Sequence, residues 1–269
     1  MNQFWDEVLA FAEATTKTVG QKLLEDFGQV QADLKADGSL VTRCDRWSDD
    51  TLRQAIKTQF PDHGVLSEEV EHIFPATDWC WIIDPIDGTT NFTRGIPVWG
   101  ISLGLLYRGT PVFGYVAMPP LGQSFYGYWP GESGLEMPSG AFCNGRPLHA
   151  SEAAPNKTQF FSLCARSTSV LERPFPCKIR MLGSAAYNLL LVGAGWAVGA
   201  VEATPKIWDV AAVWAIVQAA GATWVPLNDV EPFPLEAGKD YSRQPYPTLA
   251  AAQSSLVETF RPLVQKVVK

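Results

Sequence analysis

Hydrophobic and charged positions at the start of the chain repeat with the period of a helix. Over residues 4–27, apolar side chains recur about every 3.6 residues with charged residues between them, which predicts a long amphipathic helix. Residues 48–59 predict a second helix, which a proline and a glycine stop. Between the two helices, an Asp-Gly pair within residues 35–42 favours a hairpin or a turn.

Several apolar runs have the length of buried strands, and two of them end on acidic residues. Residues 64–67 lead into a pair of glutamates, and residues 79–83 lead into an aspartate. Residues 98–129 alternate apolar and small side chains between turn signals, a rhythm typical of antiparallel strands. The first half of the chain therefore predicts helices followed by a sheet.

The second half mixes strand-like and helix-like runs. Residues 130–145 are rich in proline and glycine, and we place a subdomain border there, with one subdomain at 1–140 and the other at 141–269 of one compact fold. The expected strands are 159–163, 196–202 and 223–226, and the expected helices are 184–192, 209–220 and 254–268. Mixed helices and strands predict an α/β or α+β protein.

Composition narrows the class of protein. Hydrophobic residues make up 46% of the 269 residues and charged residues 18%, which is enough apolar material for a large core. The 21 basic and 28 acidic residues give a net charge of −7 without a basic cluster, which argues against nucleic-acid binding. Charge-free runs at 182–201 and 210–228 contain glycine, asparagine or proline, so we read them as buried soluble segments and expect no membrane partner.

The five cysteines are odd in number, widely spaced and lack a Cys-x-x-Cys pair. This pattern predicts free thiols in a reducing compartment and no zinc ribbon. The N-terminal residues lack a basic and apolar leader pattern, so we expect a cytoplasmic protein.

The sharpest chemical signal is the segment Asp84-Pro85-Ile86-Asp87-Gly88. Pro85 biases Asp84 toward an extended conformation and Gly88 permits a tight reversal, so Asp84 and Asp87 can face one pocket. The Ile86 carbonyl would point the same way, and amides from Gly88 onward could form an anion-binding nest or a helix start.

Further acids adjoin apolar elements elsewhere in the chain. Glu68-Glu69 follows one predicted strand, and Asp209 precedes an apolar helix. Taken singly, these acids have ordinary explanations. The segment from Asp84 to Gly88 could be a turn, Glu68-Glu69 a solvated pair and Asp209 a helix cap. All of these acids could nevertheless share one sheet edge, and crowded carboxylates need protons or bound cations.

Oxygen ligands select hard cations, which predicts Mg²⁺ as the cofactor. The three histidines, His63, His72 and His149, have no ligand spacing, so zinc has no obvious site. An acidic pocket that also offers amides and hydroxyls suits phosphoryl transfer, in which metal ions activate water and stabilise the leaving oxygen.

Three segments resemble the inositol monophosphatase family of Mg²⁺-dependent, lithium-sensitive phosphatases. These are residues 64–69, 81–92 and 208–212, and together they extend the resemblance over nearly the whole chain. The resemblance implies an α+β fold, the layered α-β-α-β-α sandwich of the inositol monophosphatase and fructose-1,6-bisphosphatase type. It also implies a homodimer.

The resemblance further implies roles for individual residues. The metal ligands would be Glu68, Asp84, the Ile86 carbonyl, Asp87 and Asp209. The substrate would contact Gly88, Thr89, Thr90, Gly183, Ser184, Ala185 and Glu202, together with Asp87 and Asp209. Thr89, with Asp45 behind it, would orient the attacking water, Glu68 would share the base role, and Lys35 would lie in a hairpin that closes over the site. Residues 218–222 and Arg43-Cys44 depart from the family pattern, which affects the shape of the substrate wall.

We therefore expect Mg²⁺-dependent hydrolysis of a small phosphorylated polyol, with myo-inositol monophosphate as the leading substrate. Histidinol phosphate, fructose 1,6-bisphosphate and 3′-phosphoadenosine 5′-phosphate are the alternatives, and Asn91-Phe92 resembles the inositol branch more than the nucleotide branch. A catalytically inactive binding module is a different class, which the intact acidic set argues against. A dinucleotide-binding oxidoreductase is disfavoured, because the glycines of residues 193–199 have the wrong spacing and precede a strand.

Overall fold

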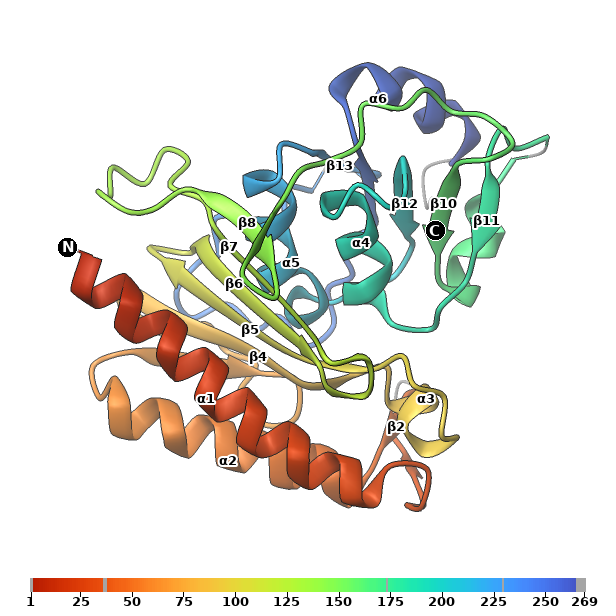
Figure 1. Ribbon diagram of the computed structural model, residues 1–269. Helices are drawn as coiled ribbons and strands as arrows, with labels where there is room; N and C mark the ends of the chain where they lie inside the picture. Colours follow the sequence, from red (N-terminus) through yellow and green to blue (C-terminus); the bar gives the residue numbers. More distant parts are fainter. Residues whose placement is uncertain (1, 36–37, 173, 229, 265–269) are drawn as a thin grey trace.

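Two β-sheets form the framework of the protein, which is described by a computed structural model (Figure 1). The structure describes residues 2–35, 38–172, 174–228 and 230–264. The first sheet contains β3 (Gly64–Ser67), β4 (Trp79–Asp87), β5 (Gly100–Tyr107), β6 (Thr110–Met118), β7 (Gln123–Tyr128), β8 (Gly140–Cys143) and β9 (Arg146–Leu148), in that order across the sheet. The second contains β10 (Phe160–Leu163), β11 (Lys178–Arg180), β12 (Gly199–Glu202), β13 (Thr223–Pro226) and β14 (Thr248–Ala251), in the order β11-β10-β12-β14-β13.

Helices form three layers around these sheets. They are α1 (Asn2–Asp26), α2 (Arg43–Gln59), α3 (Thr89–Thr93), α4 (Ala185–Gly193), α5 (Ile207–Ala219) and α6 (Ser254–Phe260). Helices α1 and α2 cover the outer face of the first sheet, α4 and α5 lie between the two sheets, and α6 packs on the far side of the second sheet (Figure 1). The expected α-β-α-β-α sandwich is confirmed. Short β1 (Asp33–Leu34) and β2 (Leu40–Val41) form the expected hairpin, while Asp37 of its turn lies outside the described residues.

The first sheet shows how alternation in the sequence becomes structure. From β4 to β9 every neighbouring pair is antiparallel, which confirms the prediction for residues 98–129. The predicted strand at 79–83 continues to Asp87, the end of β4. The expected subdomain border at residue 140 falls at the first residue of β8, within this sheet, and it stays a prediction.

Three expected element boundaries were wrong. Helix α2 begins at Arg43 and not at 48, because the Thr42 side chain accepts from backbone amides of the first turn while Asp45 accepts from the Thr42 amide. The strand expected from 196 begins at Gly199. Helix α6 ends at Phe260, since a short 3₁₀ turn with a proline near its start follows, and residues 265–268 of the expected helix lie outside the described residues.

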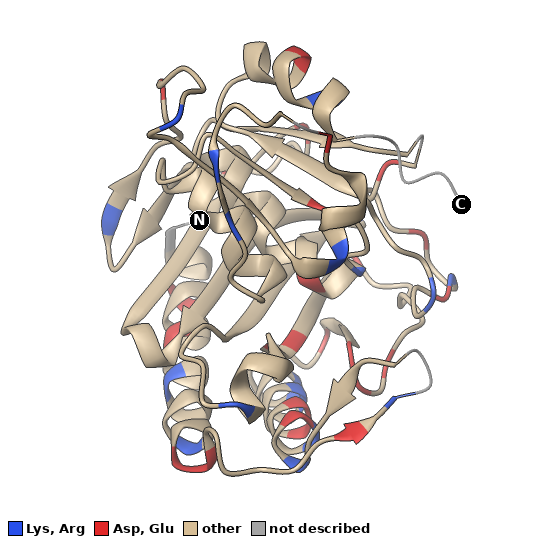
Figure 2. Ribbon diagram, turned by 90° about the vertical axis from the view of Figure 1, so that its right-hand side faces the viewer, with Lys and Arg blue, Asp and Glu red and all other residues tan. Residues whose placement is uncertain are grey.

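Acidic and basic residues are interspersed on the two helices at the bottom of Figure 2, α1 and α2. These two helices therefore carry charges of both signs. No helix among the described residues combines the length and the apolar character needed to span a membrane.

A row of glycines allows α5 to lie unusually close to the first sheet. Gly104, Gly114 and Gly127 are neighbours on β5, β6 and β7, because Gly104 pairs with Gly114 and Gly114 pairs with Gly127. A Cβ atom on Gly114 would stand 2.0 Å from the carbonyl oxygen of Ala212 in α5, and one on Gly127 would stand 2.8 Å from the Cα of Ile216. Helix α5 therefore crosses the sheet in a trough without side chains, and the trough fixes where its first turn lies.

We predict that Gly114→Ala lowers the free energy of unfolding by at least about 2 kcal/mol, because a methyl group would overlap the α5 backbone. Gly193→Ala is the matched control, since its Cβ would meet its nearest atom, in Val217, at an ordinary 3.4 Å. Denaturant unfolding of both variants measures the difference. Equal stability of the two variants would contradict the close packing of α5.

Candidate active site

The end of β4 turns two buried aspartates toward one point. Asp84 pairs with Ser102 and Asp87 pairs with Gly100 on β5, with a register shift between the two pairs. In a regular strand, residues three apart point to opposite faces, so this irregularity re-aims one of the two side chains. The Ile86 amide donates to Asp84 Oδ1 at 3.1 Å, which holds the bend.

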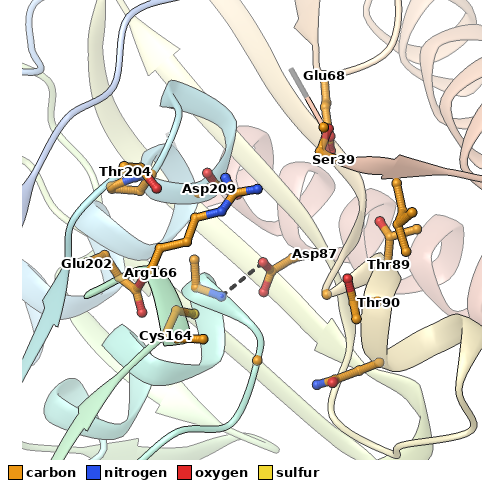
Figure 3. Close-up of a pocket in the computed structure, with 18 residues that line it drawn as sticks. Ser39, Glu68, Asp87, Thr89, Thr90, Cys164, Arg166, Glu202, Thr204 and Asp209 are labelled. Carbon is orange, nitrogen blue, oxygen red and sulfur yellow. Dashed lines mark hydrogen bonds between the residues drawn. The ribbon is translucent and has the colours of Figure 1, made fainter. Parts of the chain in front are cut away.

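A third aspartate reaches the same point from the start of α5. Asp209 lies in the first turn, where its Oδ2 accepts from the Lys206 amide at 2.5 Å. Carboxylate oxygens of Asp84, Asp87 and Asp209 lie within 4.8 Å of one another, a spacing that could hold a metal ion. Figure 3 shows Asp87 and Asp209 from different elements facing one pocket.

Helix α4 holds Asp87 through its N-terminal end. The Ser184 hydroxyl donates to Asp87 Oδ2, and the amides of Ala185 and Ala186 donate to the same carboxylate at 3.1 Å each. Gly183 and Ala185 line the pocket, whereas the buried Ser184 hydroxyl is engaged by Asp87. The predicted substrate-wall segment therefore acts first as the support of an acidic residue.

Burial makes this cluster hard to ionise without a cation. Desolvation raises the pKa of Asp87 to about 6, although hydrogen bonds from Ser184 and the α4 amides oppose the rise. Burial, reinforced by repulsion from neighbouring carboxylates, raises the pKa of Asp84 and of Asp209 well above the ordinary value. An all-oxygen set of this kind fits a hard divalent cation, whose charge would offset both costs.

Glu68 follows β3 and lines the same pocket, but its carboxylate is engaged by a lysine. Lys35 Nζ lies 2.8 Å from Glu68 Oε1 and 2.6 Å from Glu69 Oε1. Burial raises the pKa of Glu68 to about 7, against the opposing influence of Lys35. Glu68 therefore lies beside the three-aspartate cluster, and it is paired with Lys35 from the hairpin.

The predicted water-orienting pair is brought together across 44 residues of sequence. Thr89 Oγ1 lies 3.0 Å from Asp45 Oδ1 and 3.1 Å from the Ile86 carbonyl oxygen. Asp45 is fully buried, and its other oxygen accepts from the Thr42 amide at 2.7 Å and the Thr42 hydroxyl at 2.6 Å. The cap that starts α2 therefore also fixes Asp45 behind Thr89.

Gly88 has the left-handed backbone, with φ of 92°, that lets the chain leave β4 and start α3. A Cβ atom there would lie 3.1 Å from the Val98 carbonyl oxygen, so a larger residue would be both strained and crowded. Gly88, Thr89 and Thr90 all line the pocket.

The opposite wall of this cavity of about 360 Å³ comes from the second sheet. Strands β10 and β12 are parallel neighbours, so the residues after their carboxyl ends meet at one edge. Glu202 ends β12, and Cys164, Arg166 and Thr204 lie on the same side of the pocket (Figure 3). Sequence reasoning found Glu202 and missed the other three, since the sequence does not reveal that β10 and β12 are adjacent.

Two groups on this wall have distinctive electrostatics. Glu202 is 3% exposed, and burial raises its pKa to about 8, although a hydrogen bond from Asn188 opposes the rise. Arg166 is exposed and is the one lysine or arginine among the described residues that line the pocket.

Comparison with known proteins places this architecture in a family. The chain matches the inositol monophosphatase family over residues 5–265. It is 32% identical to a histidinol-phosphatase from Chlorobaculum parvum over 224 residues, which cover 79% of this chain and 83% of the relative. It is 34% identical to a fructose-1,6-bisphosphatase/inositol-1-monophosphatase from Thermotoga maritima over 221 residues, which cover 79% of this chain and 82% of the relative.

A solved structure shows the same fold. An inositol monophosphatase from Thermotoga maritima superimposes with a TM-score of 0.77 at 30% identity, covering 96% of this chain and 94% of that one. Together with the buried aspartate cluster, these matches show that the chain belongs to the inositol monophosphatase family and is a phosphoric monoester hydrolase of that family.

Proposed function

We propose that this hydrolase uses Mg²⁺ to cleave a small phosphorylated polyol, with myo-inositol monophosphate as its leading substrate. The observation that carries the proposal is the convergence of three aspartate carboxylates, two of which, Asp87 and Asp209, line the same pocket as the Gly88 turn. A role in packing does not account for the carboxylate cluster, because buried carboxylates repel one another and destabilise the fold. Together they suit a site that takes a cation and a phosphate side by side.

The proposed metal ligands are Glu68, Asp84, the Ile86 carbonyl, Asp87 and Asp209. When bound, Mg²⁺ would act as a Lewis acid toward the phosphoryl oxygens and help to activate water. The carboxylates come from β4, from the segment after β3 and from α5, so only the folded chain presents them together. Glu68 would exchange its Lys35 partner for the cation, and Glu69 would keep the lysine in place.

Thr89 and Asp45 are proposed to hold the attacking water. With the Thr89 hydroxyl donating to Asp45 Oδ1, the Thr89 oxygen is free to accept a proton from a water in the pocket. Asp45 is buried and anchored at its other oxygen, so it can take up the proton that Thr89 passes on. Glu68 would share this base role. The amides of Gly88, Thr89 and Thr90, together with the Thr90 hydroxyl, would bind the phosphate.

The substrate alcohol is proposed to contact Glu202, Gly183 and Ala185, whereas the buried Ser184, also expected there, donates to Asp87 and supports this wall from behind. The oxygens of the Glu202 carboxyl group can accept hydrogen bonds, which suits the hydroxyls of a polyol. This side of the pocket favours inositol monophosphate over a nucleotide as the substrate. The names of the relatives keep histidinol phosphate and fructose 1,6-bisphosphate as alternatives.

Arg166 favours the bisphosphate among these alternatives. It is exposed on the wall opposite Thr89 and Thr90, where a second phosphate of a substrate could reach it. An arginine can bind a phosphate through two parallel hydrogen bonds. The expected homodimer and the expected cytoplasmic location stay predictions.

A panel of the four esters measures substrate choice, with phosphate release in the presence of Mg²⁺ as the readout. We expect myo-inositol monophosphate to give the highest kcat/KM. Arg166→Gln should lower kcat/KM for fructose 1,6-bisphosphate by about tenfold, because it loses a charged hydrogen bond, and leave the inositol ester within about twofold. No release from any ester would refute the proposed activity.

Asp84→Asn tests the metal assignment and the inactive-module alternative together. The amide oxygen can still accept from Ile86, and the variant removes a carboxyl group whose ionisation is opposed by burial and by its neighbours, so we expect the metal-free variant to melt no lower than the wild type. Turnover with Mg²⁺ should fall by at least about 100-fold. Glu152→Gln, which neutralises an exposed acid, is the control. Unchanged turnover in Asp84→Asn would disprove the metal role.

Protons and Mg²⁺ should compete for the cluster. Because the aspartate pKa values are raised on folding, the metal-free native state binds more protons than the unfolded chain, and these groups contribute less stability as the pH rises from about 4 through the raised values. A bound cation would offset the charge of the ionised aspartates and so remove this loss of stability at high pH. We expect Mg²⁺ to raise Tm more at about pH 8 than at about pH 5. Thermal unfolding with and without Mg²⁺ checks this, and an equal shift at both pH values would contradict it.

A further inference from the structure

The alcohol side of the pocket depends on a buried polar network behind Glu202. Asn188 in α4 and Ser162 in β10 are both fully buried. Asn188 Nδ2 donates to Glu202 Oε1 at 2.9 Å, and the Ser162 hydroxyl donates to Asn188 Oδ1 at 2.6 Å. Neither residue lines the cavity, so neither is a candidate for direct contact with a substrate.

The network fixes which way the Asn188 amide faces. Its oxygen is taken by the Ser162 hydroxyl, so its NH₂ group points to two acceptors, Glu202 Oε1 and the Cys164 sulfur at 3.1 Å. The opposite orientation would set the amide oxygen against the Glu202 carboxylate. The oriented amide uses one acceptor site of Glu202, and the Cys164 thiol hydrogen-bonds to the same carboxyl group, so two protein partners fix its position at the edge of the pocket.

Helix α4 connects this network to the metal side of the site. The N-cap Ser184 and the amides that follow it hold Asp87, and Asn188 lies one helical turn further along. A single turn of α4 thus contacts one carboxylate from each side of the pocket. The separation between Asp87 and Glu202 is set by this rigid turn, because both ends of the turn are hydrogen-bonded.

We propose that Asn188 is a positioning residue for substrate discrimination: it holds Glu202 at a fixed distance from Asp87, so that a polyol whose phosphate is at the cluster meets the carboxylate with its hydroxyls. Ser162 supports it by orienting the amide. The inference rests on the proposed hydrolysis of a phosphorylated polyol. It adds a residue outside the pocket that governs how well the alcohol is recognised and leaves the phosphate chemistry unaffected.

The test compares two esters that share the phosphate and differ in the alcohol. Myo-inositol 1-phosphate offers ring hydroxyls to Glu202, and 4-nitrophenyl phosphate offers none. Asn188→Leu should raise KM for the inositol ester by about tenfold with a smaller change in kcat, and should leave kcat/KM for the aryl ester within about threefold. Leu189→Met, a volume-conserving change at the next buried position of α4, is the control and should alter neither.

A double-mutant cycle distinguishes an effect that acts through Glu202 from a general loss of packing around the pocket. Glu202→Gln should also raise KM for the inositol ester, and Asn188→Leu should add little in that background because its target is already changed. Ser162→Ala is a milder second variant, should Asn188→Leu fold poorly, and is expected to raise the same KM by about threefold.

Equal losses on both esters, or effects of Asn188→Leu and Glu202→Gln that multiply, would overturn the positioning role. If the wild-type protein prefers another ester of the panel, that ester replaces the inositol compound in the same comparison. A wild-type protein that releases phosphate from neither ester nor from the panel refutes the proposed function itself, and an active wild type with unselective variants refutes only the role of Asn188.

Discussion

Repulsion between buried carboxylates is the constraint around which this fold is arranged. Asp84, Asp87 and Asp209 lie within 4.8 Å of one another, and burial raises the pKa of each. Such a cluster weakens the fold unless protons or a cation neutralise it, so the surrounding structure must hold it by other means. The stabilising interactions come from two large apolar clusters on either side of the first sheet.

The two helices between the sheets turn that framework into a site. Helix α5 lies in the glycine trough of the first sheet and carries Asp209 in its first turn, so the position of that acid follows from backbone packing. Helix α4 packs against α5 and holds Asp87 with its first amides and Ser184. Since both helices are packed on both sides, the acids that they position have little freedom to move apart when they are charged.

The two sides of the pocket differ in how they are built. On the side proposed to bind phosphate, a β-strand irregularity, a left-handed glycine and a short helix bring Asp87, Gly88 and Thr89 together within a few residues. On the side proposed to bind the alcohol, the wall comes from the carboxyl ends of parallel strands β10 and β12 and the segments that follow them. Variation in those segments can alter the proposed alcohol wall while the aspartate cluster is retained, which is consistent with relatives at similar identity that carry different substrate names.

The sequence alone determined the long helix at the start of the chain, the antiparallel strands, and the acids at the ends of apolar runs, because each of these is a local pattern of spacing or of turn chemistry. It misplaced the start of α2, where an aspartate completes the cap that sequence rules assign to glutamate or glutamine. Only the tertiary structure decided that Ser184 supports Asp87, that Glu68 is paired with Lys35, and that Arg166, Cys164 and Asn188 surround Glu202. These are contacts between elements far apart in the chain, and strand order and helix docking, which no local pattern encodes, create them.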